Sequence, residues 1–458
     1  MFTQGQGRPR LAAHDNQLQA ALKSRHVSMI AIGGIIGAGL FVGSSSSIAQ
    51  VGPAVVMSYG LAGLVVLMVM RMMAEMAALR PGLGAFTELV REVLGPRAGF
   101  VCGWLYWYFW VIVVPIEAIA GAKILHIWID APVWAIGVAL LGALTGVNLM
   151  STRSYGEFEY WFSLMKVLAI VSFIAIAGVW AFGLTSPTGP TWSNLNAYGG
   201  FAPHGWGAVL AGTASVIFAL TGAEIATVAA AESHEPARTI ARITSSVAAR
   251  IILFYVLSLL LIVAVMPWTS IVPGTSPFAI ALGHMAIPHA EFVMNLVVLV
   301  AVLSCLNSGM YVTSRVLFVL ADKGDAPAWL VAVNRRKVPA RAILIASLFG
   351  YLALAASVIS PELVFSFLVN ASGALMLFIY FTVGVAQIVQ RRRIEAQGRE
   401  TLPIRMWLFP YLSYATLGAI LSILVAMMFA PARRVELVSS LVTLGVAMGA
   451  AWWRNRRV

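Results

Sequence analysis

The chain has 458 residues, of which 60% are hydrophobic and 10% are charged, and its mean hydropathy is +0.88. Soluble globular proteins average about 25% charged residues, so these values exclude an ordinary soluble fold, which has no way to bury this much apolar surface. A lipid bilayer accommodates it, at about 20 apolar residues for each spanning helix. The net charge of +12 would indicate nucleic-acid binding in a soluble protein, so the placement of the basic residues decides its meaning.

Twelve apolar stretches follow a polar segment of 26 residues that lacks the short apolar core and cleavage site of a signal peptide. Because backbone groups in lipid must be hydrogen-bonded within their own segment, we predict that every stretch is a helix and that the fold is an all-α polytopic membrane protein. The predicted helices span approximately residues 27–49, 53–79, 98–125, 132–150, 156–182, 207–231, 241–266, 289–320, 340–359, 362–390, 406–430 and 435–453.

Basic residues predict the orientation, because the cytoplasmic loops of membrane proteins carry an excess of Lys and Arg. With the N-terminus in the cytoplasm, 25 of the 30 Lys and Arg residues fall in inside segments and three fall outside. The other two, Lys166 and Arg315, lie within apolar stretches. This distribution predicts that both termini are cytoplasmic, and it explains the positive charge without nucleic acid.

The first stretch contains "IAIGGIIGAGLFVGSSSS" (30–47), which has five glycines within eleven residues. Glycine costs roughly 0.8–1 kcal/mol relative to alanine inside a helix, so this helix is weakened at its middle. The GxxxG spacing in it also suits close helix packing. The sixth stretch is weakened in a similar way by Gly212 and Gly222, and it carries an acid, Glu224.

Weakened helices at positions one and six predict two five-helix halves that enter the membrane from opposite sides. This is the inverted-repeat plan of secondary transporters, in which the substrate site lies where two broken helices meet. The predicted segments are a cytoplasmic N-terminal tail (1–26), a first five-helix repeat (27–182), an extracytoplasmic loop (183–206), a second repeat (207–390), a cytoplasmic linker (391–405), helices 11 and 12 (406–453) and a cytoplasmic C-terminus (454–458).

Several blocks of sequence resemble permeases of the amino acid–polyamine–organocation superfamily, most closely the 4-aminobutyrate permeases of its bacterial amino-acid transporter branch. The resemblance implies a leucine-transporter-like fold of ten core helices plus two peripheral ones, and proton-coupled uptake across the inner membrane of a bacterium. The blocks are "LKSRHVSMIAIGGIIGAGLFVGSS" (22–45), "MRMMAEMA" (70–77), "GWLYWYFWVIVVPIEA" (103–118), "YGEFEYW" (155–161), "AAAESHEPAR" (229–238), "LSCLNSGMYVTSR" (303–315), "GDAPA" (324–328) and "RMWLFPYL" (405–412).

The resemblance also implies a substrate site built from backbone groups. The carboxylate of an amino acid would meet the N–H groups of Ala38 and Gly39, because the start of a half-helix favours negative charge. The ammonium would meet carbonyls of the first and sixth helices, which favour positive charge. The expected substrate-binding residues are Ile35, Gly37, Ala38, Gly39, Phe218, Thr221 and Gly222. Many relatives have Ser or Thr at the position of Ala38, whereas 4-aminobutyrate permeases have Ala.

Three charges within the membrane are predicted to be functional, because a lone charge there costs roughly 2.5–3.5 kcal/mol. In related permeases a lysine at the position of Lys166 looks like a replacement for a bound sodium ion that couples protons to transport; the alternatives are a fixed ion pair or a snorkelling lysine. Glu117 is expected to accept a proton or to pair with a polar group. Glu224 is expected to cap the broken sixth helix or to gate the pocket, with proton transfer as the alternative.

Other features receive structural predictions. Cys102 and Cys305 are expected to be small packing residues, and "WLYWYFW" (104–110) is expected to be an interface and packing cluster. Asn307 and Ser308 could line the cavity or hydrogen-bond a neighbouring helix, and we favour the second. We expect Glu157 and Glu159 to pair with basic residues on the cytoplasmic side rather than to bind substrate.

Other functional classes are less consistent with the sequence. "GAGLFVG" (37–43) is close to a dinucleotide fingerprint, but its third glycine is one residue late and no strand precedes it. We therefore expect no enzyme, cofactor or metal site. The two unlike halves suit alternating access better than a channel. The predicted substrate is 4-aminobutyrate or a related small amino acid, taken up with protons; proline, aromatic or other neutral amino acids, and amino-acid exchange, are the alternatives.

Overall fold

The computed structural model describes residues 36–79, 86–150, 152–222, 251–361, 374–398 and 404–455, together with a few single residues that include Glu224. All regular secondary structure in these ranges is helical, as the sequence predicts. Seven helical runs are long and apolar enough to cross a membrane: Gly39–Leu79, Pro96–His126, Val133–Met150, Gly156–Ala181, Ala290–Asp322, Tyr411–Phe429 and Arg433–Arg454. The total of twelve spans stays a prediction, because parts of several stretches lie outside the described residues.

The helices follow the predicted apolar stretches closely. The longer ones are α3 (Val55–Leu79), α5 (Pro96–His126), α6 (Val133–Met150), α7 (Thr152–Ala181), α9 (Gly205–Leu220), α14 (Ala290–Asp322), α15 (Ala340–Ala356), α17 (Leu375–Ala396), α18 (Tyr411–Phe429) and α19 (Pro431–Asn455). The shorter ones are η1 (Gly39–Gly43), α2 (Ser44–Val51), η2 (Gly52–Ala54), α4 (Phe86–Leu94), α8 (Asn194–Ala197), η3 (Ile251–Leu257), α12 (Ser258–Val265), η4 (Trp268–Ser270), α13 (Pro277–His284) and η5 (Ala328–Val331).

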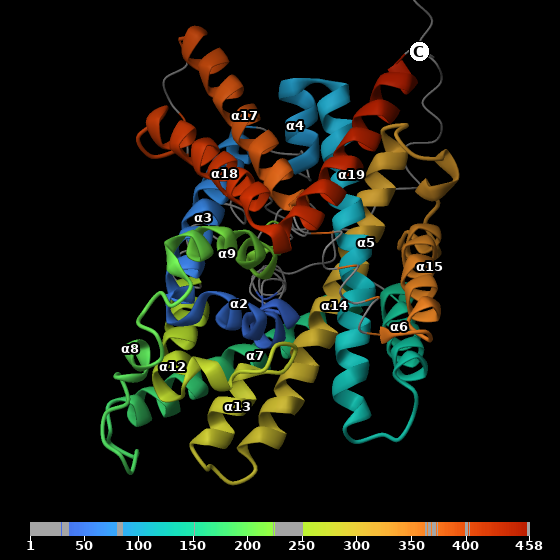
Figure 1. Ribbon diagram of the computed structural model, residues 1–458. Coiled ribbons are helices and arrows are strands. Elements are labelled where there is room, and N and C mark those ends of the chain that lie inside the picture. The colour runs from blue at the N-terminus through green and yellow to red at the C-terminus, as the bar shows by residue number, and fades with distance from the viewer. Residues whose placement is uncertain are drawn as a thin grey trace, which may run out of the picture.

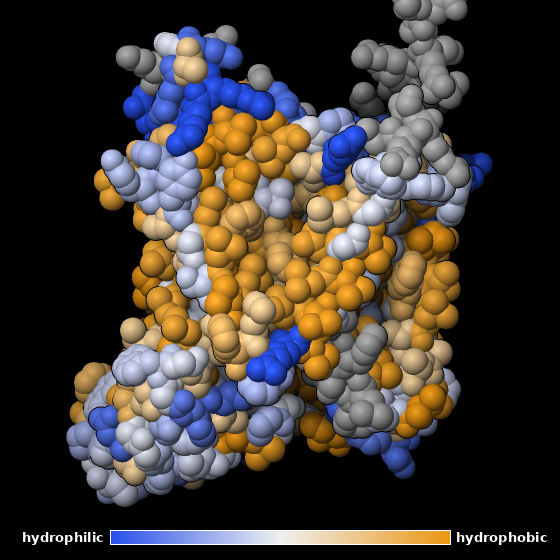
Figure 2. All heavy atoms as spheres, turned by 45° about the horizontal axis from the view of Figure 1, so that its top comes forward, coloured by the Kyte–Doolittle hydropathy of each residue, from blue (hydrophilic) through white to orange (hydrophobic). Residues whose placement is uncertain are grey.

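The two ends of the molecule differ in character. Helix α4 and the C-terminal ends of α17 and α19 lie at one end, and α8 and α13 lie at the other (Figure 1). Figure 2 shows hydrophobic residues across the middle of one face, with hydrophilic residues gathered above and below them. Such a band is the surface expected of a protein that spans a bilayer.

Helices α5 and α14 form the centre of the bundle. Helix α14 packs along α5 and also contacts α7 and α15, and most side chains of its central turns are buried. Peripheral α18 and α19 instead expose large apolar side chains such as Leu421, Val442 and Trp453. A helix that is apolar all round is either buried inside a bundle, as α5 and α14 are, or faces lipid, as expected of α18 and α19.

A helix start and a helix end lie where the sequence predicts breaks in the first and sixth helices, and they are called the first and second interruptions below. Residues 30–35 and 225–250, on the other side of each, lie outside the described part of the chain. In the first, residues 36 and 37 form a bend, and η1 begins at Gly39 as a π-helical turn that continues into α2. In the second, α9 ends at Leu220, Thr221 is extended (φ −65°, ψ 139°) and Gly222 has φ +126°. A φ in this range is strained for other residues but costs glycine little, so Gly222 allows the chain to leave the helix there.

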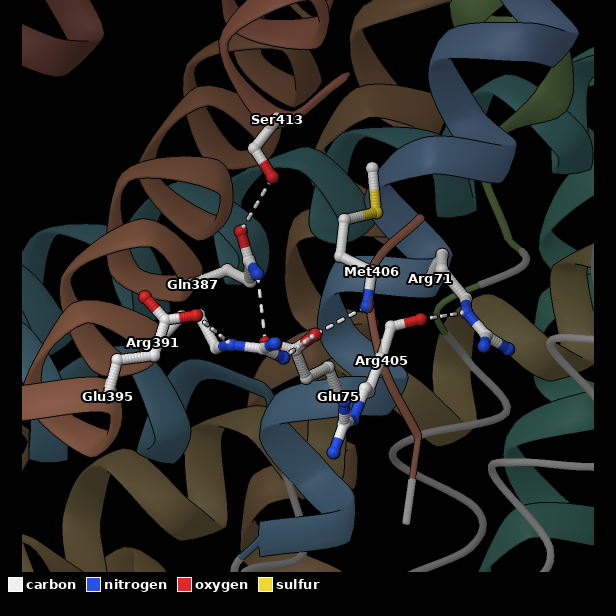
Figure 3. Close-up of polar contacts among 8 residues, drawn as sticks. All are labelled: Arg71, Glu75, Gln387, Arg391, Glu395, Arg405, Met406 and Ser413. Carbon is white, nitrogen blue, oxygen red and sulfur yellow. Dashed lines mark hydrogen bonds and ion pairs between the residues drawn. The ribbon is translucent and has the colours of Figure 1, made fainter. Parts of the chain in front are cut away.

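Figure 3 shows how the segment before α18 is attached to the bundle. The carboxylate of Glu75 on α3 accepts hydrogen bonds from Gln387 Nε2 (2.9 Å), Arg391 Nη1 (3.3 Å) and the Met406 backbone N–H (2.5 Å). Helix α17 runs to Ala396, past residue 391 where the linker was predicted to begin. The ion pairs of Arg391 with Glu75 and Glu395 stabilise this extra turn.

Candidate functional site

A small cavity lies between the two helix interruptions. Residues of η1, α5, α14 and the end of α9 line it, together with Gly37. The lining residues are Gly37, Gly39, Phe109, Trp110, Val113, Glu117, Phe218, Ala219, Thr221 and Cys305. Four of the predicted substrate-binding residues, Gly37, Gly39, Phe218 and Thr221, are therefore brought together at one cavity. Ala38 and Gly222 adjoin it in sequence without being among its lining residues, and Ile35 lies outside the described residues.

The first interruption presents the start of a half-helix to this cavity. The Gly37 carbonyl accepts the N–H groups of Leu40 (3.2 Å) and Phe41 (3.3 Å), so helical hydrogen bonding begins at Gly37. The N–H groups of Ala38 and Gly39 precede these bonds and belong to the donors that a helix start leaves without intrahelical acceptors. This is the local geometry in which backbone groups bind a carboxylate.

The glycines of the first interruption also permit close packing. A Cβ atom added at Gly39 would lie 2.8 Å from the Ala219 Cα, and one added at Gly37 would lie 2.8 Å from the Cys305 Sγ. These distances are too short for any real side chain, so Gly39 lets η1 and α9 touch. Gly37 and Gly39 therefore both permit close helix packing and line the cavity.

The second interruption is held by the Glu224 carboxylate. Its two oxygens accept the Gly222 N–H at 3.2 and 3.1 Å, and they also accept hydrogen bonds from the hydroxyls of Tyr106 (3.5 Å) and Tyr380 (3.3 Å). These tyrosines come from α5 and α17. The buried acid thus ties the broken end of the sixth helix to two neighbouring helices, and it does not line the cavity.

Lys166 on α7 is fully buried, and its ammonium reaches the first interruption. It donates a hydrogen bond to the Ile36 carbonyl (2.8 Å) and another to Ser304 Oγ on α14 (2.7 Å). One lysine therefore joins the broken first helix to both α7 and α14. Burial of an ammonium is costly unless acceptors of this kind surround it.

The prediction for Glu159 was wrong, because this residue does not pair with cytoplasmic basic residues. It is buried, and its Oε1 accepts hydrogen bonds from Ser304 Oγ (2.6 Å) and Ser163 Oγ (3.1 Å). The same oxygen lies 3.9 Å from Lys166 Nζ. The seven-residue spacing places both charges on one face of α7, and this pattern is the signal that was available in the sequence.

Glu117 brings a second buried carboxyl group to the cavity. It is 3% exposed, and its Oε1 lies 3.3 Å from the position that a Gly37 Cβ would occupy. The Ala38 N–H and the Cys305 thiol hydrogen-bond to this carboxyl group. Cys305 therefore lines the cavity as well as packing in the core, a role that sequence reasoning missed.

Aromatic side chains close one side of the cavity. Phe109 contacts Phe218 with ring centroids 5.8 Å apart, and it contacts Trp110 at 5.6 Å. Phe109 and Trp110 belong to the "WLYWYFW" cluster, which was predicted to serve the interface and packing; both are buried in the core, and both also line the cavity. Asn307 behaves as predicted: its Oδ1 accepts a hydrogen bond of 2.9 Å from Asn148 Nδ2 on α6.

Comparison with known proteins identifies the family. The model of the amino acid permease family matches residues 26–454. The chain is 46% identical over 433 residues to the gamma-aminobutyric acid permease of Bacillus subtilis (strain 168), covering 94% of this chain and 92% of that protein. It is 43% identical over 445 residues to the gamma-aminobutyric acid permease of Escherichia coli (strain K12), covering 95% and 94%. The aromatic amino acid transport protein AroP of Escherichia coli (strain K12) is 34% identical over 424 residues, covering 92% and 93%. The chain belongs to the amino acid permease family.

Proposed function

We propose that this permease imports 4-aminobutyrate or a related small amino acid across the bacterial inner membrane by proton symport with alternating access. The observation that carries the substrate assignment is the 46% and 43% identity, over nearly the whole chain, to two permeases named for gamma-aminobutyric acid. The identity to the aromatic transporter is lower, at 34%. Aromatic amino acids are therefore the second candidates.

The cavity suits a small zwitterion. The Gly39 N–H supplies a positive helix start for a carboxylate; the Ala38 N–H, predicted for the same role, is directed to the Glu117 carboxyl group. Phe109, Trp110 and Phe218 supply an apolar wall against which a short methylene chain can lie. In our proposal Thr221 and Gly222 let the sixth helix open so that its carbonyls face this cavity.

Lys166 is the residue that we propose for proton coupling. Its hydrogen bond to the Ile36 carbonyl links its protonation state to the position of the broken first helix. Loss of the proton would remove the charge that holds this carbonyl and would leave Glu159 without its counter-ion. Both effects weaken the attachment of the first helix to α7 and α14, which is the kind of two-state contact that alternating access requires.

The proposed arrangement in the membrane follows the sequence. Two inverted five-helix repeats (27–182 and 207–390) would contribute one broken helix each, and both termini would face the cytoplasm. Glu224 would hold the break in the sixth helix through the Gly222 N–H.

The test is uptake of labelled 4-aminobutyrate by the purified protein in proteoliposomes. We expect saturable accumulation that requires a pH gradient, acid outside, and that a protonophore abolishes. Competition by a panel of amino acids ranks the substrates, with proline and phenylalanine as the discriminating competitors. Stronger competition by phenylalanine than by unlabelled 4-aminobutyrate would contradict the substrate assignment. Flux that does not saturate would indicate a channel, and exchange with no accumulation would indicate an exchanger.

A further inference from the structure

We propose that the carboxylate of Glu117 is the acceptor for the substrate's ammonium group. This assignment rests on the proposed function, in that it takes the substrate to be an amino acid, but it does not depend on which one. The central observation is that Glu117 is the single charged residue among the described residues that line the cavity. An ammonium group that enters this cavity therefore meets one full negative charge.

The two oxygens of Glu117 are not equally satisfied. Oε1 lies beside Gly37, and the carboxyl group receives the Ala38 N–H and the Cys305 thiol. Oε2 is buried and has no hydrogen-bond partner among the described residues. A buried carboxylate oxygen without a partner is unfavourable, so a donor is expected to fill the position during the transport cycle. An ammonium group has three such donors.

Three backbone carbonyls around the interruptions are already engaged within the protein. The Ile36 carbonyl accepts from Lys166, and the Ala219 carbonyl accepts from the Tyr255 hydroxyl (3.2 Å). The Phe218 carbonyl accepts the Thr221 N–H (3.2 Å). A carbonyl has a second lone pair, but an ionised carboxylate forms hydrogen bonds about twice as strong. Glu117 is therefore the best acceptor that the lining residues offer to an ammonium group.

Lys166 does not take this position, because its ammonium is directed to the Ile36 carbonyl and to Ser304 Oγ. The aromatic rings of Phe109 and Trp110, on the same helix as Glu117, add faces that attract cations. Glu117 thus sits at the polar end of a mostly apolar and aromatic cavity, where its charge is little screened by water.

This assignment gives binding of the substrate ammonium to Glu117 and proton coupling to Lys166, two residues that the sequence had both linked to proton coupling. An ammonium group favours the ionised form of Glu117, so substrate and proton compete for this side chain. Binding of a symported proton must instead favour binding of the substrate. The proton that moves with the substrate is then carried elsewhere, and Lys166 with Glu159 is the buried pair that remains for it.

The experiment compares wild type with Glu117→Gln and Glu117→Asp in counterflow, with equal pH on both sides of the proteoliposome. Counterflow needs substrate binding and exchange but no net proton movement. We expect Glu117→Gln to raise the KM for 4-aminobutyrate roughly 10- to 100-fold, which is the loss expected for a hydrogen bond to a charged group. Glu117→Asp keeps the charge and should recover part of the affinity. Glu291→Gln, an exposed acid at the start of α14, is the matched control and should leave KM unchanged.

Inhibition by 4-hydroxybutyrate, which keeps the carboxylate and lacks the ammonium, provides the second measurement. Wild type should discriminate strongly against it, and Glu117→Gln should lose most of this discrimination. Unchanged counterflow KM in Glu117→Gln, together with lost accumulation in a pH gradient, would overturn the proposal and make Glu117 a proton carrier. If wild type carries a different amino acid, only the proposed substrate fails, and the same comparison is made with that amino acid and its hydroxy analogue.

Discussion

The Lys166 ammonium donates a hydrogen bond of 2.8 Å to the carbonyl of Ile36, which lies 130 residues earlier in the chain. The same ammonium donates to Ser304 on α14, whose hydroxyl in turn donates to Glu159. Four residues from three segments therefore form one buried chain of contacts beside the cavity. A change in any of them is expected to affect the position of the first helix, and several measurements follow from this arrangement.

Replacing Lys166 with glutamine is expected to abolish accumulation of substrate in a pH gradient while counterflow at equal pH persists. The physical reason is that glutamine cannot exchange a proton, whereas exchange of substrate does not require one. The variant is also expected to be less stable, by about 3–5 kcal/mol, because Glu159 loses its buried counter-ion. Uptake in proteoliposomes and thermal unfolding in detergent measure the two effects.

The double variant Lys166→Gln with Glu159→Gln is the control for that loss of stability. Removing both charges leaves no unpaired ion, so most of the unfolding free energy should return. Accumulation should not return with it. Recovery of proton-driven accumulation in the double variant would show that the pair is structural and that protons take another route.

Gly39→Ala is expected to impair both folding and transport. Its Cβ would lie 2.8 Å from the Ala219 backbone, which cannot move aside, and overpacking of this kind costs about 1–3 kcal/mol. Gly43→Ala is the matched control, because its Cβ would have its nearest neighbour at 3.6 Å and its backbone is already helical. That substitution should be neutral or stabilising, by up to about 1 kcal/mol. Equal losses in both variants would contradict a specific contact between η1 and α9.

Glu224→Gln is expected to retain most proton-driven accumulation, because the amide oxygen can still accept the Gly222 N–H and the tyrosine hydroxyls can reorient toward the amide. Glu224→Ala removes every acceptor and leaves the Gly222 N–H and the hydroxyls of Tyr106 and Tyr380 without this partner. It should lose transport together with several kcal/mol of stability, at about 1–3 kcal/mol for each unsatisfied donor. Loss of accumulation in Glu224→Gln, with counterflow intact, would instead indicate proton transfer.

Glu75→Ala is expected to release the segment around Met406 from α3. The Glu75 side chain is 2% exposed and accepts three hydrogen bonds, so its removal leaves Arg391 without its buried partner and should cost about 3 kcal/mol or more. Faster trypsin cleavage after Arg405 in detergent would report the release. The control is Glu395→Gln, because Glu395 is a half-exposed partner of Arg391 whose ion pair contributes only about 0.2–1 kcal/mol. Equal cleavage in both variants would argue against this attachment.

Two of the motifs that carried the family resemblance meet in the same attachment. Arg71 and Glu75 belong to "MRMMAEMA", and Arg405 and Met406 belong to "RMWLFPYL". The Arg71 Nε donates to the Arg405 carbonyl (2.9 Å), and its guanidinium lies over the Trp407 ring (Figure 3 shows the polar contacts). More than 300 residues separate the two motifs, so nothing in their local sequence predicts this contact.

The sequence by itself determined the properties that depend on local free energies. Hydropathy placed the helices, because each apolar stretch must enter lipid and hydrogen-bond its own backbone there. Gly222 was one of two glycines that indicated a weak point in the sixth helix, and glycine tolerates the positive φ found there. The sequence also singled out Lys166, because an ammonium within an apolar helix is costly; its part in proton coupling is our proposal.

Only the tertiary structure decided which side chains face one another. Glu159 and Lys166 lie on one face of α7, but Ser304 comes from α14 and Ile36 from the first helix. The lining of the cavity by Trp110 and Cys305 depends in the same way on how α5 and α14 rotate against the two broken helices. These rotations are set by close packing among many residues that are far apart in the chain. No single stretch of sequence determines the energy of that packing.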